Sequence, residues 1–163
     1  MESPWIDFSS SSEKFSASFP SKVNRLFHGH FQDDGLSPAS ILFSSSDTND
    51  VLYEVRVTRL MQIYGPITDF LELAIDEMSK SISNSKVIRT DFLTFKNHQA
   101  IGFELQVDTI TTVLGIAMVH DKTLYLLSTL FGVATDHQFI RFIDNFDLQH
   151  TQGAQKSDTG PDA

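Results

Sequence analysis

The sequence predicts an α+β domain in which an antiparallel sheet of about six or seven strands is flanked by helices. Two observations lead to this fold class. Apolar and polar residues alternate along most of the chain, which is the period of half-buried strands. Only residues 65–83 and 135–146 space their apolar residues three and four apart, as amphipathic helices do. The 163 residues, 40% of them hydrophobic, suffice for one core, and we assign a single domain to residues 1–148.

The first part of the chain is predicted to supply four strands. The segment KFSASFP alternates apolar residues with serines and stops at Pro20, which cannot donate a hydrogen bond to a strand ladder. Residues 26–31 and 39–43 are the next two strands, and the turn-rich segment QDDGLSP between them predicts a hairpin. Residues 51–60 alternate valine and tyrosine with charged side chains, so this strand has one buried face.

A helix and a meander of four strands follow. The predicted helix has Pro66 in its first turn, acidic residues early and Lys80 late, as the helix dipole favours. Four alternating segments joined by short polar connections then predict an antiparallel meander. Residues 111–119 are apolar on both faces, so we place this strand centrally in the sheet.

The C-terminal part of the chain is predicted to form a closing helix and a tail. Thr135 and Gln138 have the spacing of a capping box, in which each side chain bonds a free N–H near the other. Several phenylalanines and isoleucines then form one apolar stripe. Residues 149–163 are polar and carry too little apolar surface to offset the entropy of ordering, so we expect this tail to be disordered.

Composition excludes several classes of function. A formal net charge of -9 disfavours binding to nucleic acid and to anionic lipid. The absence of cysteine excludes disulfides, thiolate nucleophiles and cysteine-bound zinc. No glycine-rich phosphate loop and no serine in a nucleophile-elbow context is present. No apolar run approaches the roughly 18 residues of a membrane span, so membrane insertion is not expected.

The first residues set the expectation for location. The start MESPWIDF lacks the basic and apolar regions of a signal peptide. As the sequence stands we expect a cytoplasmic protein, and a periplasmic or secreted one if a signal segment was removed. The compartment therefore stays open.

Four short segments, in their order along the chain, resemble elements of the PsbP-like superfamily. They are KFSASFP, GFELQV, TLYLLS and RFIDNFDL. This superfamily includes the photosystem-associated PsbP proteins, the Ran-binding Mog protein and small bacterial secreted proteins. The resemblance covers about residues 5–148 and implies an α/β/α sandwich that binds a protein partner and has no shared catalytic residues. Val23 and Asn145 stand where the family often has proline and serine, and neither position bears on chemistry.

The stretch LFHGHFQDDG offers a candidate metal site. On an extended strand His28 and His30 would point to one face, and Asp33 or the adjacent Asp34 could add an oxygen ligand. Two imidazoles and a carboxylate suit zinc or copper. The spacing is unspecific, because a polar hairpin uses the same residues without any metal, and we favour that second interpretation. No other cofactor is predicted.

Charged residues on the strands offer a second candidate site. Glu54, Arg56 and Glu104 point outward from strands that could be neighbours, so they could line a polar groove as acid, anion clamp and base. The alternative is cross-strand charge pairing on a sheet face, which needs no substrate. We favour charge pairing, and we expect no enzyme activity.

The favoured function is that of a non-catalytic accessory protein that docks on a protein partner. Phe27, Phe31 and Phe43 are less clearly part of the core than the other phenylalanines, so they are the candidate contact residues. The sheet edge or the hairpin around residues 26–43 would supply the surface, and the negative charge favours a partner with a basic surface. A metal-binding protein and a small enzyme or ligand carrier with a pocket between sheet and helix are the two alternatives.

Overall fold

The computed structural model describes residues 4–28, 40–60, 63, 65–109, 111–131 and 136–149. Within them the strands are β1 (Ile6–Ser10), β2 (Phe15–Phe19), β3 (Asn24–His28), β4 (Ser40–Ser46), β5 (Leu52–Arg59), β6 (Ser85–Phe95), β7 (His98–Val107), β8 (Thr111–His120), β9 (Thr123–Phe131) and β10 (Asp147–Leu148). The helices are α1 (Ile67–Ser81) and α2 (Asp136–Asp144). No helix within these ranges is long and apolar enough to cross a membrane.

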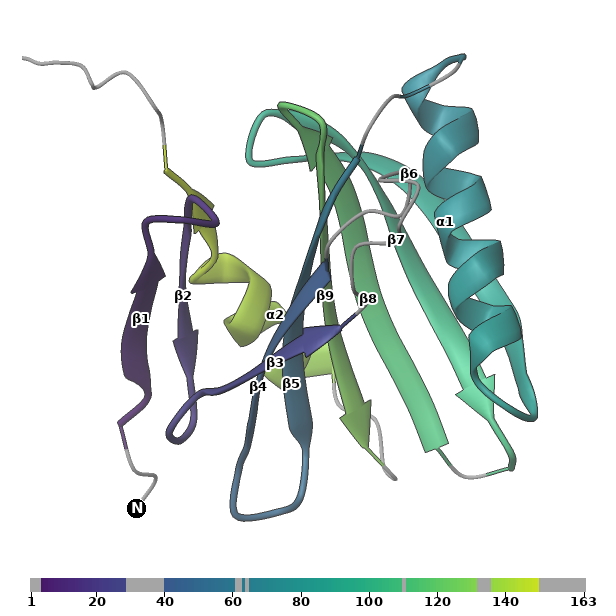
Figure 1. The fold of residues 1–163 in the computed structure, drawn as a ribbon. Coiled ribbons are helices and arrows are strands. Elements are labelled where there is room, and N and C mark those ends of the chain that lie inside the picture. The colour runs from purple at the N-terminus through teal and green to yellow at the C-terminus, as the bar shows by residue number, and fades with distance from the viewer. Residues whose placement is uncertain are drawn as a thin grey trace, which may run out of the picture.

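A seven-stranded antiparallel sheet forms the centre of the protein (Figure 1). Its strand order is β3-β4-β5-β9-β8-β7-β6, so the predicted meander and the predicted hairpin partners are both confirmed. The stretch from Val113 to Met118 of β8 is buried on both faces, between β9 and β7, which confirms that this strand lies inside the sheet. The α+β fold class is also confirmed.

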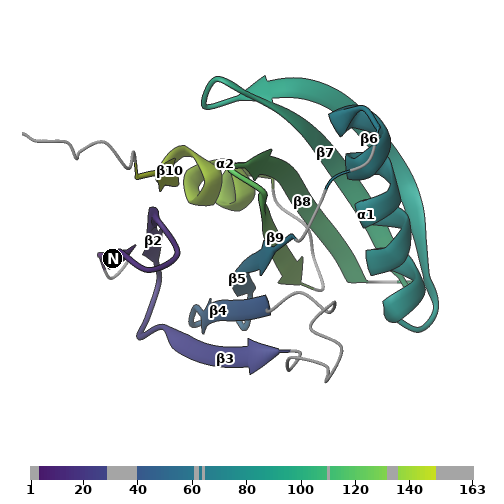
Figure 2. The ribbon, with the colours of Figure 1, turned by 45° about the horizontal axis from the view of Figure 1, so that its top comes forward.

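The two faces of the sheet are covered differently (Figure 2). Helix α1 packs on one face, over β7 and its neighbours β6 and β8. The opposite face carries α2 together with a second, three-stranded sheet in the order β1-β2-β10. Helices therefore flank the sheet on both sides, as predicted, but the small sheet is an additional element of the second layer.

Each face of the large sheet has its own apolar core. On the α1 face, Leu71 and Ile75 of the helix pack with Ile101, Phe103 and other apolar residues of β7, β8 and β9. On the opposite face the core is largely aromatic, and its rings belong to the small sheet, the large sheet and the end of α2. Burial of these rings removes a large apolar surface from water, and such burial is the main driving force for folding.

The C-terminal segment is joined to the small sheet. Leu148 pairs with Phe15. Gln149, the first residue of the predicted tail, donates its main-chain N–H to the carbonyl oxygen of Lys14 at 2.8 Å and its side-chain Nε2 to that of Phe15 at 3.2 Å. The predicted capping residue Thr135 and residues 150–163 lie outside the described residues.

Candidate functional site

A groove opens on the α1 face of the sheet, beside the helix. Helix α1 lies over β6, β7 and β8, and no other described helix covers β9 and β5 on the same face. The groove between α1 and these two strands has a volume of about 620 Å³. Its walls are mainly apolar side chains, from α1 (Phe70, Leu73, Ala74, Met78 and Ile82), from β9 (Leu124 and Leu126) and Leu60 after β5. We call this feature the α1 groove.

Three charged side chains line the α1 groove. Glu54 and Arg56 come from β5 and Glu77 comes from α1. Glu54 and Arg56 point into the groove because side chains alternate between the two faces of β5. The opposite face of this strand is buried and carries Tyr53, Val55 and Val57. The groove was the less favoured of the two interpretations of Glu54 and Arg56, and its walls are mainly apolar instead of polar.

Glu104 does not take part in this groove. It lies on β7, which is separated from β5 by β9 and β8. Its carboxylate is 3.7 Å from Nη2 of Arg89, which lies directly opposite on β6. Glu104 is therefore half of a cross-strand charge pair, the interpretation that the sequence favoured, and it does not share a groove with Glu54 and Arg56.

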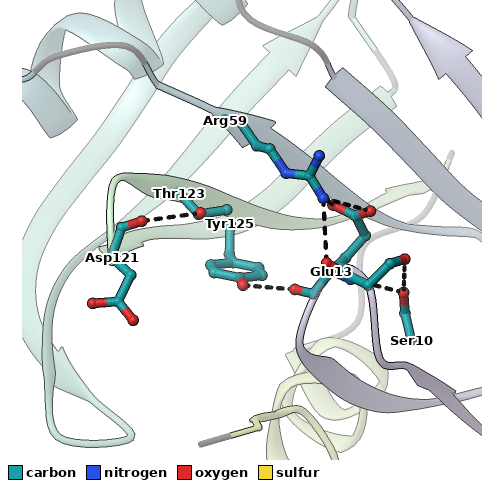
Figure 3. Close-up of polar contacts among 7 residues, drawn as sticks. Ser10, Glu13, Arg59, Asp121, Thr123 and Tyr125 are labelled. Carbon is teal, nitrogen blue, oxygen red and sulfur yellow. Dashed lines mark hydrogen bonds and ion pairs between the residues drawn. The ribbon is translucent and has the colours of Figure 1, made fainter. Parts of the chain in front are cut away.

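A second, polar pocket of about 230 Å³ lies where the β1–β2 turn meets the large sheet (Figure 3). The side chain of Glu13, in that turn, is only 5% exposed and receives Nη2 of Arg59 from β5 at 2.9 and 3.0 Å from its two oxygens. The same guanidinium donates to the carbonyl oxygen of Ser12 at 3.2 Å. A buried carboxylate is thus neutralised by a cation from the neighbouring layer.

Tyr125 of β9 completes this polar cluster. Its hydroxyl donates to the main-chain carbonyl oxygen of Glu13 at 2.7 Å (Figure 3). Burial, with smaller contributions from the negative charges of Glu13 and Asp121, raises the pKa of Tyr125 from about 10 to about 12. The phenol therefore keeps its proton and acts as a donor. The arrangement joins two layers of the fold, and it offers no base paired with a nucleophile.

Two histidines from neighbouring strands form a pair. His98 begins β7 and His120 ends β8, and Nε2 of His98 lies 2.9 Å from Nδ1 of His120. Both rings are partly buried. The two residues are 22 positions apart, and they meet because β7 and β8 pair antiparallel in a register that sets them opposite each other. Across the described residues, no group of three or more histidine, aspartate or glutamate side chains is arranged to hold a metal ion.

The predicted hairpin site is described only in part. His28 lies at the end of β3, with its backbone opposite Ser40. His30, Phe31 and Asp33 lie outside the described residues, as do the side chains of His28 and Phe27. Both interpretations of this stretch, the metal site at His28, His30 and Asp33 and the favoured polar hairpin without metal, therefore stay expectations from the sequence.

Phe43 is the one predicted contact residue whose side chain is described, and it is not on the surface. It is 0% exposed. It lies opposite Val55 on the face covered by the small sheet, where its ring is 5.1 Å from that of Phe15 and 5.4 Å from that of Phe8. The small sheet covers this face, and it explains why the predicted exposure of Phe43 is wrong.

Comparison with known proteins adds one finding about the fold. No protein-family model matches the chain, and no curated protein matches it. The solution structure of cyanobacterial PsbP (CyanoP) from Synechocystis is similar, with a TM-score of 0.55 over 88% of this chain and 92% of that one, at 12% identity. The fold is PsbP-like.

The PsbP-like fold confirms what the four sequence motifs predicted for the architecture. A crystal structure of PA94, a Pseudomonas aeruginosa protein of unknown function, is similar with a TM-score of 0.43, at 10% identity and over 83% of this chain and 88% of that one. The function of this PsbP-like chain has to be argued from its own surface.

Proposed function

We propose that this PsbP-like domain is a non-catalytic binding protein that docks on a protein partner by holding an apolar segment of that partner in the α1 groove. The observation that supports it is the volume of about 620 Å³ with predominantly apolar walls. Binding sites are concave, largely apolar and equipped with a few polar groups that fix orientation, and the α1 groove has these properties.

Exposed apolar surface at the groove supports an apolar contact. Leu73 is 55% exposed, which is the largest exposure among the large hydrophobic side chains of the described residues. It stands on α1 next to Phe70 and Ala74 in the groove wall. Covering the exposed half of this side chain would contribute about 1 kcal/mol to binding, roughly half of the value for fully burying a leucine.

Charge supports a basic partner. The exposed side of α1 carries Asp69, Glu72, Asp76 and Glu77, and Lys80 is the basic residue of its last turn. Glu54 and Glu77 at the groove outnumber its one cation, Arg56. Together with the net charge of -9, these carboxylates would attract a segment whose apolar residues are flanked by lysine or arginine.

The polar cluster gives no support for an enzyme. Glu13 is held by Arg59, and Tyr125 donates to a main-chain oxygen, so each group already has a structural partner. Acid–base catalysis needs a group poised to exchange a proton near neutral pH, whereas the pKa of Tyr125 is raised to about 12.

The test places a photo-crosslinking amino acid at position 73 in cells of the native organism. The matched control carries it at Ile140, which is 50% exposed on α2. We expect one partner to be crosslinked at position 73 and not at position 140, with the crosslink mapping to an apolar segment flanked by basic residues. Equal labelling from both positions, or no adduct at position 73 in folded protein, would count against the groove.

A small ligand is the second candidate occupant, and one feature of the groove favours it. Arg56 is exposed at a cavity whose volume lies within the range of small-molecule sites, so an apolar carboxylate would fit its chemistry. Native mass spectrometry of protein purified from its own organism decides this. A retained small molecule that is lost in Ala74→Trp, which fills the groove, would establish a ligand carrier.

A further inference from the structure

Strand β6 is an unusually exposed sheet edge. It lies at one end of the seven-stranded sheet, so no described strand pairs with its outer side. It is 11 residues long, and four of its large apolar side chains are exposed, Val87 by 37%, Ile88 by 47%, Phe92 by 50% and Leu93 by 40%. Long apolar edges are usually shortened, charged or covered, because their free N–H and C=O groups pair readily with another strand.

The sequence of β6 is complementary to itself. If two copies pair antiparallel about a two-fold axis at Thr90, Arg89 of each copy lies opposite Asp91 of the other. The same register brings Ile88, at the bulge between Val87 and Arg89, next to Phe92 of the second copy. Opposite charges and apolar pairs directly across two strands each stabilise a sheet.

Other registers are worse. Moving the axis to Arg89 sets two arginines opposite each other, and moving it to Asp91 sets two aspartates opposite each other. Moving the axis to a point midway between two residues is also unfavourable. It would set each side chain opposite one that points to the other face of the sheet, because successive residues of a strand point to opposite sides. Among axes near the middle of the strand, the one at Thr90 sets Arg89 and Asp91 each opposite a side chain of opposite charge.

The layers leave room for this pairing. Helix α1 lies over β7, one strand in from the edge, so two copies would bring their β7 strands about 14 Å apart, three strand spacings. Packed helices need about 8–10 Å between axes, so the two α1 helices fit side by side. The α1 groove lies on the other side of the helix, toward β5, and stays open in both copies.

Local charge favours a second copy over the basic partner proposed for the groove. The chain as a whole carries -9, but β6 has two cations, Lys86 and Arg89, and one anion, Asp91. The paired strands themselves therefore add little like-charge repulsion when two copies approach along this edge.

We propose that the protein forms a homodimer in which the β6 strands pair antiparallel across a two-fold axis at Thr90, joining two seven-stranded sheets into one. This inference does not depend on what the α1 groove binds. Sedimentation velocity on the full chain at micromolar concentration tests it, and we expect the mass of a dimer.

Charge exchange tests the register. The variants Arg89→Asp and Asp91→Arg should each be monomeric. In either variant, both contacts between position 89 of one copy and position 91 of the other join two side chains of the same charge. An equimolar mixture of the two should form a heterodimer, and the double variant should dimerise again. Because Arg89 also lies 3.5 Å from Asp91 and 3.7 Å from Glu104 within the chain, circular dichroism must show that each variant is folded.

Two further variants complete the design. Phe92→Lys keeps the charges of Arg89 and Asp91 but removes an apolar contact, so it should abolish the dimer. Lys80→Asp changes a charge on α1, away from the edge strand, and should leave the dimer intact. A monomeric wild type overturns the inference. A dimer that survives both Arg89→Asp and Phe92→Lys also overturns it, since the interface would then lie elsewhere.

Discussion

Nε2 of His98 lies 2.9 Å from Nδ1 of His120, and the two rings meet edge to face at 86°. Nδ1 of His98 is 2.8 Å from the carbonyl oxygen of Lys96, so this nitrogen carries the hydrogen and Nε2 is free to accept from Nδ1–H of His120. The pair thus connects the turn before β7 with the turn after β8. At the other nitrogen of the second ring, Nε2 of His120 is 3.3 Å from the carboxylate of Asp121.

His120→Ala should lower the free energy of unfolding by about 1 kcal/mol, the usual contribution of one hydrogen bond whose partner is left partly buried. Urea unfolding at pH 7.5 measures the change. His137→Ala, at an exposed position on α2, is the matched control and should change stability by less than half as much. Equal effects of the two substitutions would mean that the histidine contact adds no stability.

Gly115→Ala should destabilise the fold, because the ring of Phe103 lies directly over Gly115. A Cβ at this position would clash with Cζ of Phe103, well inside contact distance. We expect a loss of about 1–3 kcal/mol, the usual cost of overpacking a core. Phe103→Leu should cost stability alone but make Gly115→Ala less harmful, so a double-mutant cycle in urea tests the contact. Additive effects would contradict it.

The sequence predicted the large sheet well because its strands alternate. A half-buried strand must set apolar side chains on one face, and in β5 and β7 this signal is unambiguous. The sequence did not predict the small sheet, for two reasons. Strand β10 has only two residues, and β1 has no strong alternation of apolar and polar residues that would mark it as a partner of β2. Its position over the large sheet, in turn, decides that Phe43 is buried.

The candidate sites show the same limit. The alternation of β5 predicted that Glu54 and Arg56 point away from the aromatic core, and they line the α1 groove. Alternation does not give the order of strands, so Glu104 was assigned to the wrong neighbours. The pair Glu13 and Arg59 is 46 residues apart along the chain, and no local pattern marks a contact of that kind.

Stability should fall above pH 10 because of Tyr125. Its pKa is raised to about 12 in the folded protein, mainly by burial, while an unfolded tyrosine ionises near 10. Between these values the unfolded chain binds fewer protons than the folded one, so the free energy of unfolding decreases as pH rises. Below pH 10 both states are protonated and this contribution is fully present.

Tyr125→Phe isolates this effect. The variant should be about 1 kcal/mol less stable at pH 8, because it loses the bond to the carbonyl oxygen of Glu13. The difference in unfolding free energy between wild type and variant should shrink above pH 10. There the wild type loses stability as its tyrosine ionises on unfolding, and the variant has no hydroxyl at position 125 to ionise. Urea unfolding at several pH values, with phenolate absorbance to follow ionisation, measures both. A constant difference from pH 8 to pH 11 would contradict the raised pKa.

The histidines of the predicted hairpin should not form a metal site. Zinc needs four ligands in most protein sites, and two imidazoles spaced one residue apart on a strand supply only half of them. We therefore expect His28→Ala, His30→Ala to take up zinc in calorimetric titration with the same affinity as the wild type. His98→Ala, His120→Ala is the matched control, since those rings are also close together. Saturable zinc binding lost in the first double variant and retained in the second would establish the site at His28 and His30, and Asp33→Ala would then test its carboxylate ligand.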